Sequence, residues 1–367
     1  MVCFHRAKVR KNILFFYKEN HYFCHLFISR EMKAIFQKHI LQFKRPAGTS
    51  RGVLTEKPTW LLTIEHDGRF GIGECSPLPG LSIDNIADYE RSKLLWVCQH
   101  ISLGKEALWD ELKSYPSIQF GVEQAFLSLE AQEGVLFPSA FTQGKEAIPI
   151  NGLIWMGDKE FMQQQIREKL SQGFRCIKMK IGAIDFETEY ALLKDIRQQF
   201  TPSEIELRVD ANGAFSPMDA LEKLKRLSDL QIHSIEQPIR AGQYEAMARL
   251  CEASPLPIAL DEELIGVACP SRKEEILQWI KPAYIILKPS LIGGYRGSEE
   301  WIALAEKENI GWWVTSALEG NIGLSAIAQW TYTLENPLPQ GLGTGSLYTN
   351  NFPSSLQVKN GKLWWIK

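Results

Sequence analysis

The sequence predicts an α/β protein in which an N-terminal α+β domain precedes a parallel βα barrel. The chain of 367 residues is too long for one small core. From Pro149 onward, short apolar runs alternate with amphipathic helical segments, which is typical of parallel βα units. No Gly-x-Gly-x-x-Gly motif follows any of these runs, so the sequence disfavours an open dinucleotide-binding sheet.

The region before the barrel contains strands followed by helices. Strands are predicted over residues 34–43, 60–65 and 69–74, with turns at Pro46-Ala47-Gly48 and Asp67-Gly68, and helices over 85–100 and 121–130. Met32 begins the first alternating segment, so residues 1–31 are predicted to be an extension outside the fold. The predicted domains are an α+β domain over 32–147, a barrel over 148–345 and a segment over 346–367 that packs back on the first domain.

Seven predicted strands in the second part recur at intervals of roughly thirty residues or less, which favours a closed barrel. These strands cover residues 148–153, 176–181, 205–210, 232–236, 258–261, 284–288 and 312–316. Helices are predicted over residues 158–172, 185–199, 217–227, 243–251, 298–308 and 324–333.

Composition excludes several classes of function. The formal charge of −2 gives no basic field that would attract nucleic acid or an anionic membrane. No apolar run is long enough to span a bilayer. The seven cysteines are scattered and include no CxxC pair, which favours reduced thiols in a cytoplasmic protein. Of the seven histidines, only His233 lies beyond residue 100, so a histidine-based metal site or catalytic triad in the barrel is disfavoured.

Charged residues close nearly every barrel strand, at the end where βα barrels carry their active sites. Asp210, Glu236 and Asp261 end three successive strands and are predicted to converge. Oxygen ligands without His or Cys suit Mg²⁺ or Mn²⁺ and not zinc. One such acid alone would be read as a surface carboxylate, but three in register favour a metal site. The acidic run from Asp261 to Glu263 leaves it open by one residue which of these acids is the third metal ligand. Asp261 is preferred because it directly follows the apolar run.

Three lysines accompany these acids. The period of two in a strand places Lys178 and Lys180 on one face, and Lys288 ends the sixth strand, roughly opposite. Neighbouring positive charge disfavours an ammonium and can make a lysine a general base. Two lysines that face each other across a metal-held carboxylate fit abstraction of a proton alpha to that carboxylate. The plainer reading of Lys178 or Lys288 alone is a lysine that extends to solvent.

These strand ends resemble the enolase superfamily, in its branch with two catalytic lysines. The resemblance rests on Lys178-Met179-Lys180, Asp210-Ala211-Asn212, Glu236-Gln237-Pro238, Asp261-Glu262 and Lys288-Pro289, and extends from about Met32 to the C-terminus. Further segments are similar to the o-succinylbenzoate synthase family within it. They are 45–52 (RPAGTSRG), 73–80 (GECSPLPG), 150–157 (INGLIWMG) and 341–345 (GLGTG).

The resemblance implies a modified (β/α)7β barrel of the TIM type with an N-terminal α+β capping domain. It implies a lyase that carries out syn dehydration of 2-succinyl-6-hydroxy-2,4-cyclohexadiene-1-carboxylate to 2-succinylbenzoate in menaquinone biosynthesis. Lys180 would remove the proton and then assist departure of the hydroxyl, Lys288 would stabilise the enediolate from the other face, and Lys178 would add positive charge. Asp210, Glu236 and Asp261 would hold Mg²⁺, or Mn²⁺.

Substrate contacts are expected from five further residues. Arg208 and Asn212 point inward by strand parity, and Arg51 lies in a segment, 48–52, that is a candidate lid. Ser316 ends the seventh strand and Gly343 lies in the glycine-rich turn, so both are candidates to contact the succinyl group. A purely local role for Ser316, such as capping a helix, is an equal alternative.

Two other functions fit the same residues. An N-acylamino acid racemase or dipeptide epimerase would use the same two lysines to remove and return one proton. Dipeptide epimerases carry Asp-x-Asp after the eighth strand, whereas this chain has Gly-Leu-Gly-Thr-Gly, which argues against a dipeptide substrate. A non-catalytic binding barrel is a remote alternative, because all five catalytic and metal positions are present.

Overall fold

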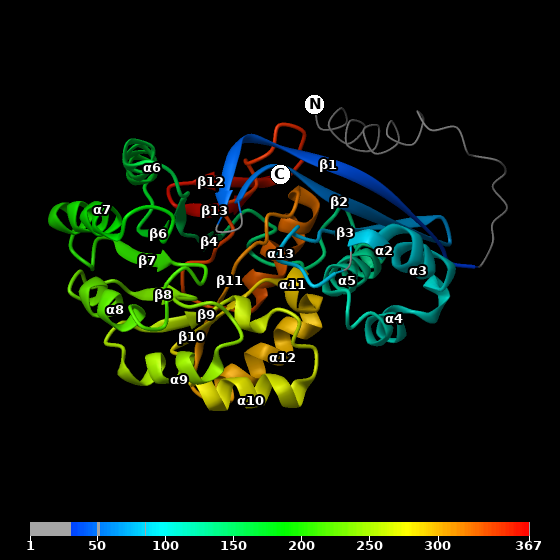
Figure 1. Ribbon diagram of the computed structural model, residues 1–367. Helices are drawn as coiled ribbons and strands as arrows, with labels where there is room; N and C mark the ends of the chain where they lie inside the picture. The colour runs from blue at the N-terminus through cyan, green and yellow to red at the C-terminus, as the bar shows by residue number, and fades with distance from the viewer. Residues whose placement is uncertain (1–30, 50–51, 85, 367) are drawn as a thin grey trace, which may run out of the picture.

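The computed structural model describes residues 31–49, 52–84 and 86–366, and these form an α+β domain packed against a parallel barrel (Figure 1). The predicted extension, residues 1–31, therefore lies almost entirely outside the described residues. The barrel sheet has seven parallel strands in the order β11-β10-β9-β8-β7-β6-β5. A βα barrel with an N-terminal domain is the fold that the sequence predicts.

The N-terminal domain contains an antiparallel sheet of β1 (Lys33–Thr49), β2 (Gly52–His66) and β3 (Arg69–Cys75). The predicted turn at 67–68 is confirmed, since Asp67 and Gly68 have φ values of 50° and 72° and form a two-residue hairpin turn. The predicted turn at 46–48 is wrong, because these residues lie inside β1, beside a shift in register between Gln42 and Ala47. β1 lies at the edge of the sheet, and an edge strand tolerates a proline such as Pro46, because its missing N–H can face away from the neighbouring strand.

One face of this sheet packs on α5 (Pro116–Glu130), which starts earlier than the predicted helix. Contact is close because the facing residues of β3 are glycines: a Cβ added at Gly73 would lie 1.8 Å from the Gly121 carbonyl oxygen. The predicted helix over 85–100 is broken into shorter pieces, and one helix was not predicted. The pieces are α2 (Ile86–Asp88), a π-helical turn (Tyr89–Leu94) and α3 (Leu95–Gln99), and the added helix is α4 (Lys105–Glu111).

Six of the seven predicted barrel strands are present with bounds shifted by at most two residues. The predicted strand 148–153 instead forms two strands in different sheets, because the first pairs with the C-terminal hairpin and the chain enters the barrel sheet only after Asn151. The strands are β4 (Ala147–Pro149), β5 (Gly152–Ile154), β6 (Cys176–Lys180), β7 (Glu206–Asp210), β8 (Ser234–Glu236), β9 (Ile258–Leu260), β10 (Tyr284–Leu287) and β11 (Gly311–Val314).

A short segment closes the barrel between its first and last strands. Gln340 bridges Ile150 and Gly341 bridges Thr315, both in parallel. A Cβ on Gly341 would lie 2.4 Å from Thr315 Oγ1, so this crossing requires glycine. The seven strands, with the bridging residues Gln340 and Gly341 in the place of an eighth, form the modified (β/α)7β barrel that the family resemblance implies.

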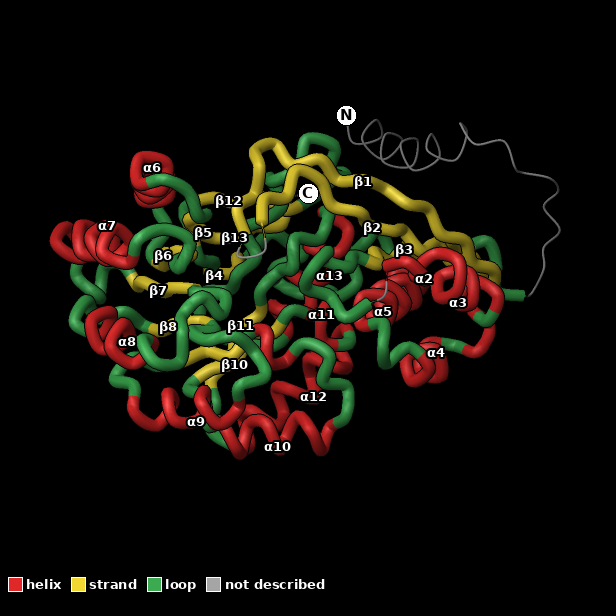
Figure 2. The backbone as a smooth tube through the Cα atoms, in the orientation of Figure 1, coloured by secondary structure: helices red, strands yellow, loops and turns green. Residues whose placement is uncertain are grey.

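Helices cover the outside of the barrel, while the strands line its inside (Figure 2). No helix among the described residues is both long enough and apolar enough to cross a membrane. Helices α10 and α11 were not predicted, and both begin with proline at the first turn. The outer helices are α6 (Lys159–Ser171), α7 (Phe186–Gln199), α8 (Ala220–Ser228), α9 (Tyr244–Ala253), α10 (Pro270–Ile280), α11 (Pro289–Ile292), α12 (Gly294–Lys307) and α13 (Asn321–Thr333).

The C-terminal segment touches both parts of the molecule. Its first residues run beside β1, where Tyr348 bridges Phe43 and the Lys44 amide donates to the Leu347 carbonyl at 2.8 Å. Its last residues form β12 (Leu356–Lys359) and β13 (Lys362–Trp365), and β13 pairs with β4. Figure 1 shows these red strands near one end of the long blue hairpin of β1 and β2.

Candidate active site

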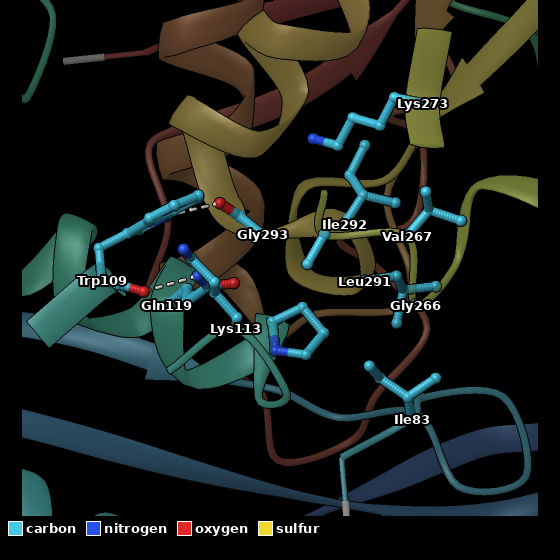
Figure 3. Close-up of a pocket in the computed structure, with 12 residues that line it drawn as sticks. Ile83, Trp109, Lys113, Gln119, Gly266, Val267, Lys273, Leu291, Ile292 and Gly293 are labelled. Carbon is cyan, nitrogen blue, oxygen red and sulfur yellow. Dashed lines mark hydrogen bonds between the residues drawn. The ribbon is translucent and has the colours of Figure 1, made fainter. Parts of the chain in front are cut away.

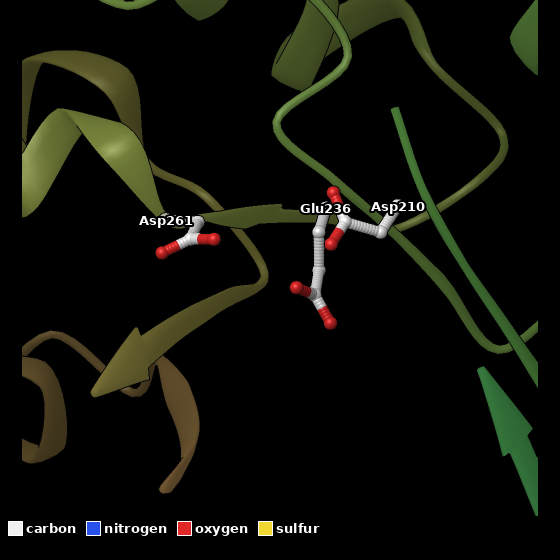
Figure 4. A group of neighbouring side chains, drawn as sticks. All are labelled: Asp210, Glu236 and Asp261. Atoms are coloured by element: carbon white, nitrogen blue, oxygen red, sulfur yellow. The ribbon is translucent and has the colours of Figure 1, made fainter. Parts of the chain in front are cut away.

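Three carboxylates gather where β7, β8 and β9 end (Figure 4). One oxygen from each of Asp210, Glu236 and Asp261 lies within 4.8 Å of the others, and the residues are 1%, 0% and 2% exposed. Parallel register brings this about, since Asp210 pairs with Glu236, which pairs with Ala259 two residues before Asp261. Among the described residues, this is the one group of three acidic, His or Cys side chains close enough to hold a metal ion.

The cluster has the donor chemistry of a divalent-cation site. All its ligand atoms are carboxylate oxygens, which Mg²⁺ and Mn²⁺ prefer. Glu236 Oε1 is buried and accepts no hydrogen bond, so one lone-pair donor is left for a further partner. Burying three like charges together is unfavourable unless cations accompany them. The residues therefore fit a bound divalent cation.

Lysine side chains surround the carboxylates from two sides of the barrel. On β6, Lys178 Nζ lies 2.9 Å from Asp210 Oδ2 and also donates to Glu236. Lys180 Nζ lies 3.1 Å from the same Asp210 oxygen. Directly after β10, Lys288 donates to Asp261. Lys180 and Lys288 therefore pair with different carboxylates of the cluster, from the second and sixth barrel strands.

Charge pairing sets the protonation of the buried site. Burial acts to lower the pKa of Lys178, but the three carboxylates outweigh it and raise that pKa. Burial likewise acts to lower the pKa of Lys288, and Asp261 and Glu262 outweigh it. Burial acts to raise the pKa of Asp210, yet the three lysines hold it well below its usual range. In Glu236 burial prevails over Lys178 and raises the pKa to about 7.

Two amide side chains connect the strand ends. Asn212, predicted at the site, accepts a hydrogen bond from Lys180 Nζ at 2.6 Å and donates to Glu262 Oε1 at 3.1 Å. Gln237, which was not predicted, accepts from the Asp261 amide at 3.2 Å and so links two ligand-bearing strands. Both have positive φ, 44° and 38°. The Glu236-Gln237-Pro238 motif is the sequence feature from which a role for Gln237 at the site could have been predicted.

The expectation that Arg208 contacts substrate is not supported by its position. Its guanidinium donates to Glu206 at 2.7 Å and to the Pro339 carbonyl at 2.9 Å, and lies 4.1 Å from the centre of the Trp313 ring. Glu206 begins β7 and Asp210 ends it, so the arginine side chain extends toward the opposite end of the barrel from the carboxylates. The mouth already holds three ammonium groups, and Glu206 offers the opposite charge.

The other expected substrate contacts have different outcomes. Ser316 is buried and shares a 2.6 Å hydrogen bond with Thr344 in the glycine-rich turn, and its contact with substrate stays a prediction. Gly343 lies beside the start of the barrel, where an added Cβ would be 3.7 Å from the Asn151 carbonyl oxygen. Arg51 lies outside the described residues.

A separate small pocket lies between the N-terminal domain and the barrel (Figure 3). Trp109 and Gln119 line one side, and Trp109 Nε1 donates to the Gly293 carbonyl at 2.9 Å. None of its lining residues is acidic. This pocket lies at the interface between the two domains, and none of the predicted site residues lines it.

Comparison with known proteins covers both domains. A family model described as "Enolase C-terminal domain-like" matches residues 161–365, and one described as "MenC, N-terminal domain" matches residues 40–129. The o-succinylbenzoate synthase of Desulfotalea psychrophila is 48% identical over 363 residues, covering 90% of this chain and 98% of that protein. The crystal structure of MenC from Desulfotalea psychrophila has a TM-score of 0.81 at 44% identity, covering 91% of this chain and 99% of that chain. The N-succinylamino acid racemase of Thermus thermophilus is 29% identical and covers 75% of this chain and 75% of that protein.

Proposed function

The chain belongs to the o-succinylbenzoate synthase family of the enolase superfamily, and on this premise we propose that it dehydrates 2-succinyl-6-hydroxy-2,4-cyclohexadiene-1-carboxylate to 2-succinylbenzoate. One observation carries the proposal: Lys180 and Lys288 reach a single buried carboxylate cluster from opposite sides of the barrel. The product feeds menaquinone biosynthesis.

The proposed cation is Mg²⁺, held by Asp210, Glu236 and Asp261. When bound, it would attract the substrate carboxylate and stabilise the negative charge that develops there. The buried, unpartnered Glu236 Oε1 and the all-oxygen ligand set support this assignment.

Lys180 acts first as the base. Its neutral amine takes the proton alpha to the substrate carboxylate, so the C–H bond breaks and an N–H bond forms. Asn212 orients the amine through its 2.6 Å hydrogen bond. The ammonium of Lys288, on the other side, stabilises the electron pair released toward the carboxylate, and Lys178 adds positive charge.

Lys180 acts next as the acid. The ammonium that it has become donates its new proton to the hydroxyl as the C–O bond breaks, and water leaves. Because one residue serves both steps, the proton and the hydroxyl depart from the same face, which makes the elimination syn. The ring becomes aromatic and Lys180 returns to the neutral amine.

Aromatisation gives a direct test. We expect the purified protein with Mg²⁺ to convert the cyclohexadiene substrate, followed by ultraviolet absorbance, and to stop when EDTA is added. Restoration by magnesium would support the requirement for this cation. No absorbance change at any divalent-cation concentration would overturn the proposed reaction.

Racemisation of N-succinylamino acids is a second candidate, supported by the 29% identity to the Thermus thermophilus racemase. Lys180 and Lys288 could each exchange a proton on one face of such a substrate. We propose this as a lesser activity of the same site. Deuterium incorporation into both enantiomers of N-succinylphenylglycine in heavy water would support it, and incorporation into neither would exclude it.

A further inference from the structure

A second set of charged side chains is buried between the N-terminal domain and the barrel, apart from the carboxylate site. Lys57 on β2, Glu74 on β3 and Glu319 after β11 are each 0% exposed. The proposed reaction assigns none of them a role. A lysine and two glutamates without access to water need compensating contacts, because burial of unpaired charge is costly.

Glu74 joins the N-terminal domain to the start of a barrel helix. Its Oε1 accepts from the Gly320 amide at 2.6 Å and its Oε2 from the Gly323 amide at 2.7 Å. These amides lie at the N-terminus of α13, where a carboxylate interacts favourably with unpaired N–H groups. Thr59, on the same face of the sheet, donates to Glu74 Oε1 at 2.9 Å.

Glu319 joins the same loop to the strand end that carries Lys288. Its Oε2 accepts from the Ala317 amide at 2.8 Å, and its Oε1 accepts from the Ser290 hydroxyl. Ser290 lies two residues beyond Lys288, on the short helix α11 that starts there. The placement of α11 and of the residue before it therefore depends on Glu319.

Lys57 supplies the positive charge for both glutamates. Its ammonium donates to Ser76 Oγ in the loop after β3. Burial lowers the pKa of Lys57, while Glu74 and Glu319 both act to raise it, so the lysine lies within electrostatic reach of each carboxylate. The formal charges of Lys57, Glu74 and Glu319 sum to −1, and all three side chains are buried.

We propose that Lys57, Glu74 and Glu319 form a positioning cluster that couples docking of the N-terminal domain to the placement of Lys288. The inference rests on the proposed function only in that it assumes a catalytic role for Lys288. Lys57 contacts no reacting atom in this scheme. Its charge acts on the two carboxylates, which accept hydrogen bonds from amides of the 317–323 segment and from the Ser290 hydroxyl.

The cluster predicts how its variants differ. Lys57→Met keeps the length of the apolar stem but leaves two buried carboxylates without a cation, so they move apart or take up water. Adding Glu319→Gln to Lys57→Met returns the net charge of the cluster to its original value of −1. The glutamine can still accept from the Ala317 amide and hydrogen-bond Ser290. The double variant should therefore recover part of what the single variant loses.

Lys273 provides a matched control. This lysine is also buried, at 1% exposed, but it pairs with Glu300 at 2.8 Å and with the Gly297 carbonyl at 3.0 Å, both on α12. Lys273→Met removes a buried ammonium of the same kind outside the positioning cluster. It should lower the melting temperature without changing kcat at a temperature where the variant is folded.

The experiment measures kcat, KM and hydrogen exchange for these variants with the full chain. For Lys57→Met we expect kcat to fall about ten- to a hundredfold with little change in KM, because Lys288 is misplaced and not removed. Amides of the 317–323 segment, which includes the first turn of α13, should exchange faster than in the original protein, and Lys57→Met/Glu319→Gln should reverse part of both effects. If Lys57→Met fails to fold, Ser290→Ala takes its place as the test. It removes no charge, and it should lower kcat by a smaller factor than that expected for Lys57→Met.

Hydrogen exchange separates this inference from the proposed function. If the original protein dehydrates no substrate but the 317–323 amides exchange faster in Lys57→Met, the proposed reaction fails and the cluster stands. If Lys57→Met and Ser290→Ala keep the original kcat, or the loop exchanges as before, the positioning role is wrong.

Discussion

Lys180 Nζ lies 3.1 Å from Asp210 Oδ2, so the proposed base and a proposed cation ligand share one ion pair across neighbouring strands. The register of β6 and β7 sets this pair, because Lys180 and Asp210 are direct cross-strand partners. The same oxygen of Asp210 also accepts Lys178 at 2.9 Å. The base on β6 is thus a direct neighbour of one cation ligand on β7, and variants should separate their roles.

Lys180→Ala should remove dehydration without removing the cation site. The variant loses a general base, and we expect kcat to fall by about 10²- to 10⁴-fold. Asp210 keeps Lys178 as a partner, so the fold and Mg²⁺ binding should change little, as measured by circular dichroism and titration calorimetry. Lys194→Ala, at an exposed lysine on α7, serves as the control. Turnover by Lys180→Ala at the original rate would show that the base is misassigned.

Glu236 should make Mg²⁺ binding depend on pH near neutrality. Burial raises its pKa to about 7 in the cation-free protein, and only the ionised carboxylate binds a cation. As the pH falls below that pKa, each bound cation must displace a proton, so the dissociation constant should rise by up to about tenfold per pH unit. Calorimetric titrations one unit above and one unit below the pKa measure this change.

The matched variant for this prediction is Glu236→Gln. It should bind Mg²⁺ more weakly and lose the pH dependence in that window, because the titrating carboxylate is gone. An affinity that stays constant between the two pH values in the original protein would contradict the role of Glu236.

Asn212→Gly should lower turnover while leaving the backbone unstrained. Asn212 has a φ of 44°, which glycine adopts without steric strain, so this substitution removes the side chain and leaves the backbone conformation accessible. Without its amide, Lys180 loses its 2.6 Å partner, and we expect kcat to fall about tenfold with a small shift in melting temperature. Asn212→Ala should be less stable than Asn212→Gly. Equal turnover in Asn212→Gly and the original protein would remove Asn212 from the mechanism.

Arg208→Met should affect stability and not catalysis. The variant leaves Glu206 without its buried partner and removes the stacking on Trp313, so we expect a loss of roughly 2–4 kcal/mol in the free energy of unfolding. Denaturant unfolding measures this loss, and kcat at low temperature should stay unchanged. A raised KM with unchanged stability would restore Arg208 as a substrate contact.

Most of the carboxylate site was predictable because it depends on local sequence and one general property of barrels. Apolar runs end in Lys180, Asp210, Glu236 and Lys288, and parallel strands present their ends at one edge. Side chains alternate with a period of two, which places Lys178 and Lys180 together. The charged residue at the end of each run was therefore enough to select these four residues.

Local periodicity could not show where long side chains go or where strands divide. Arg208 shares strand parity with Asp210, yet its guanidinium extends to Glu206 and Trp313, which depends on a strand 105 residues later in the chain. The predicted strand at 148–153 reads as one apolar run, but β4 pairs with the C-terminal β13 and β5 with β6. The stacking of Arg208 on Trp313 and the division of the predicted strand both follow from partners that are remote in sequence.

The barrel, its charged mouth and the residue types suited to a divalent cation and a lysine base could be read from the amino-acid sequence, because they follow from periodicity and strand-end position. The direction of Arg208, the division of β4 from β5 and the burial of Lys57 with Glu74 and Glu319 depend on the packing of the folded chain. Glu74 meets the Gly320 amide across 246 residues of chain. Such a contact forms when two domains dock, and no local pattern of apolar and polar residues encodes which side chains will then face one another.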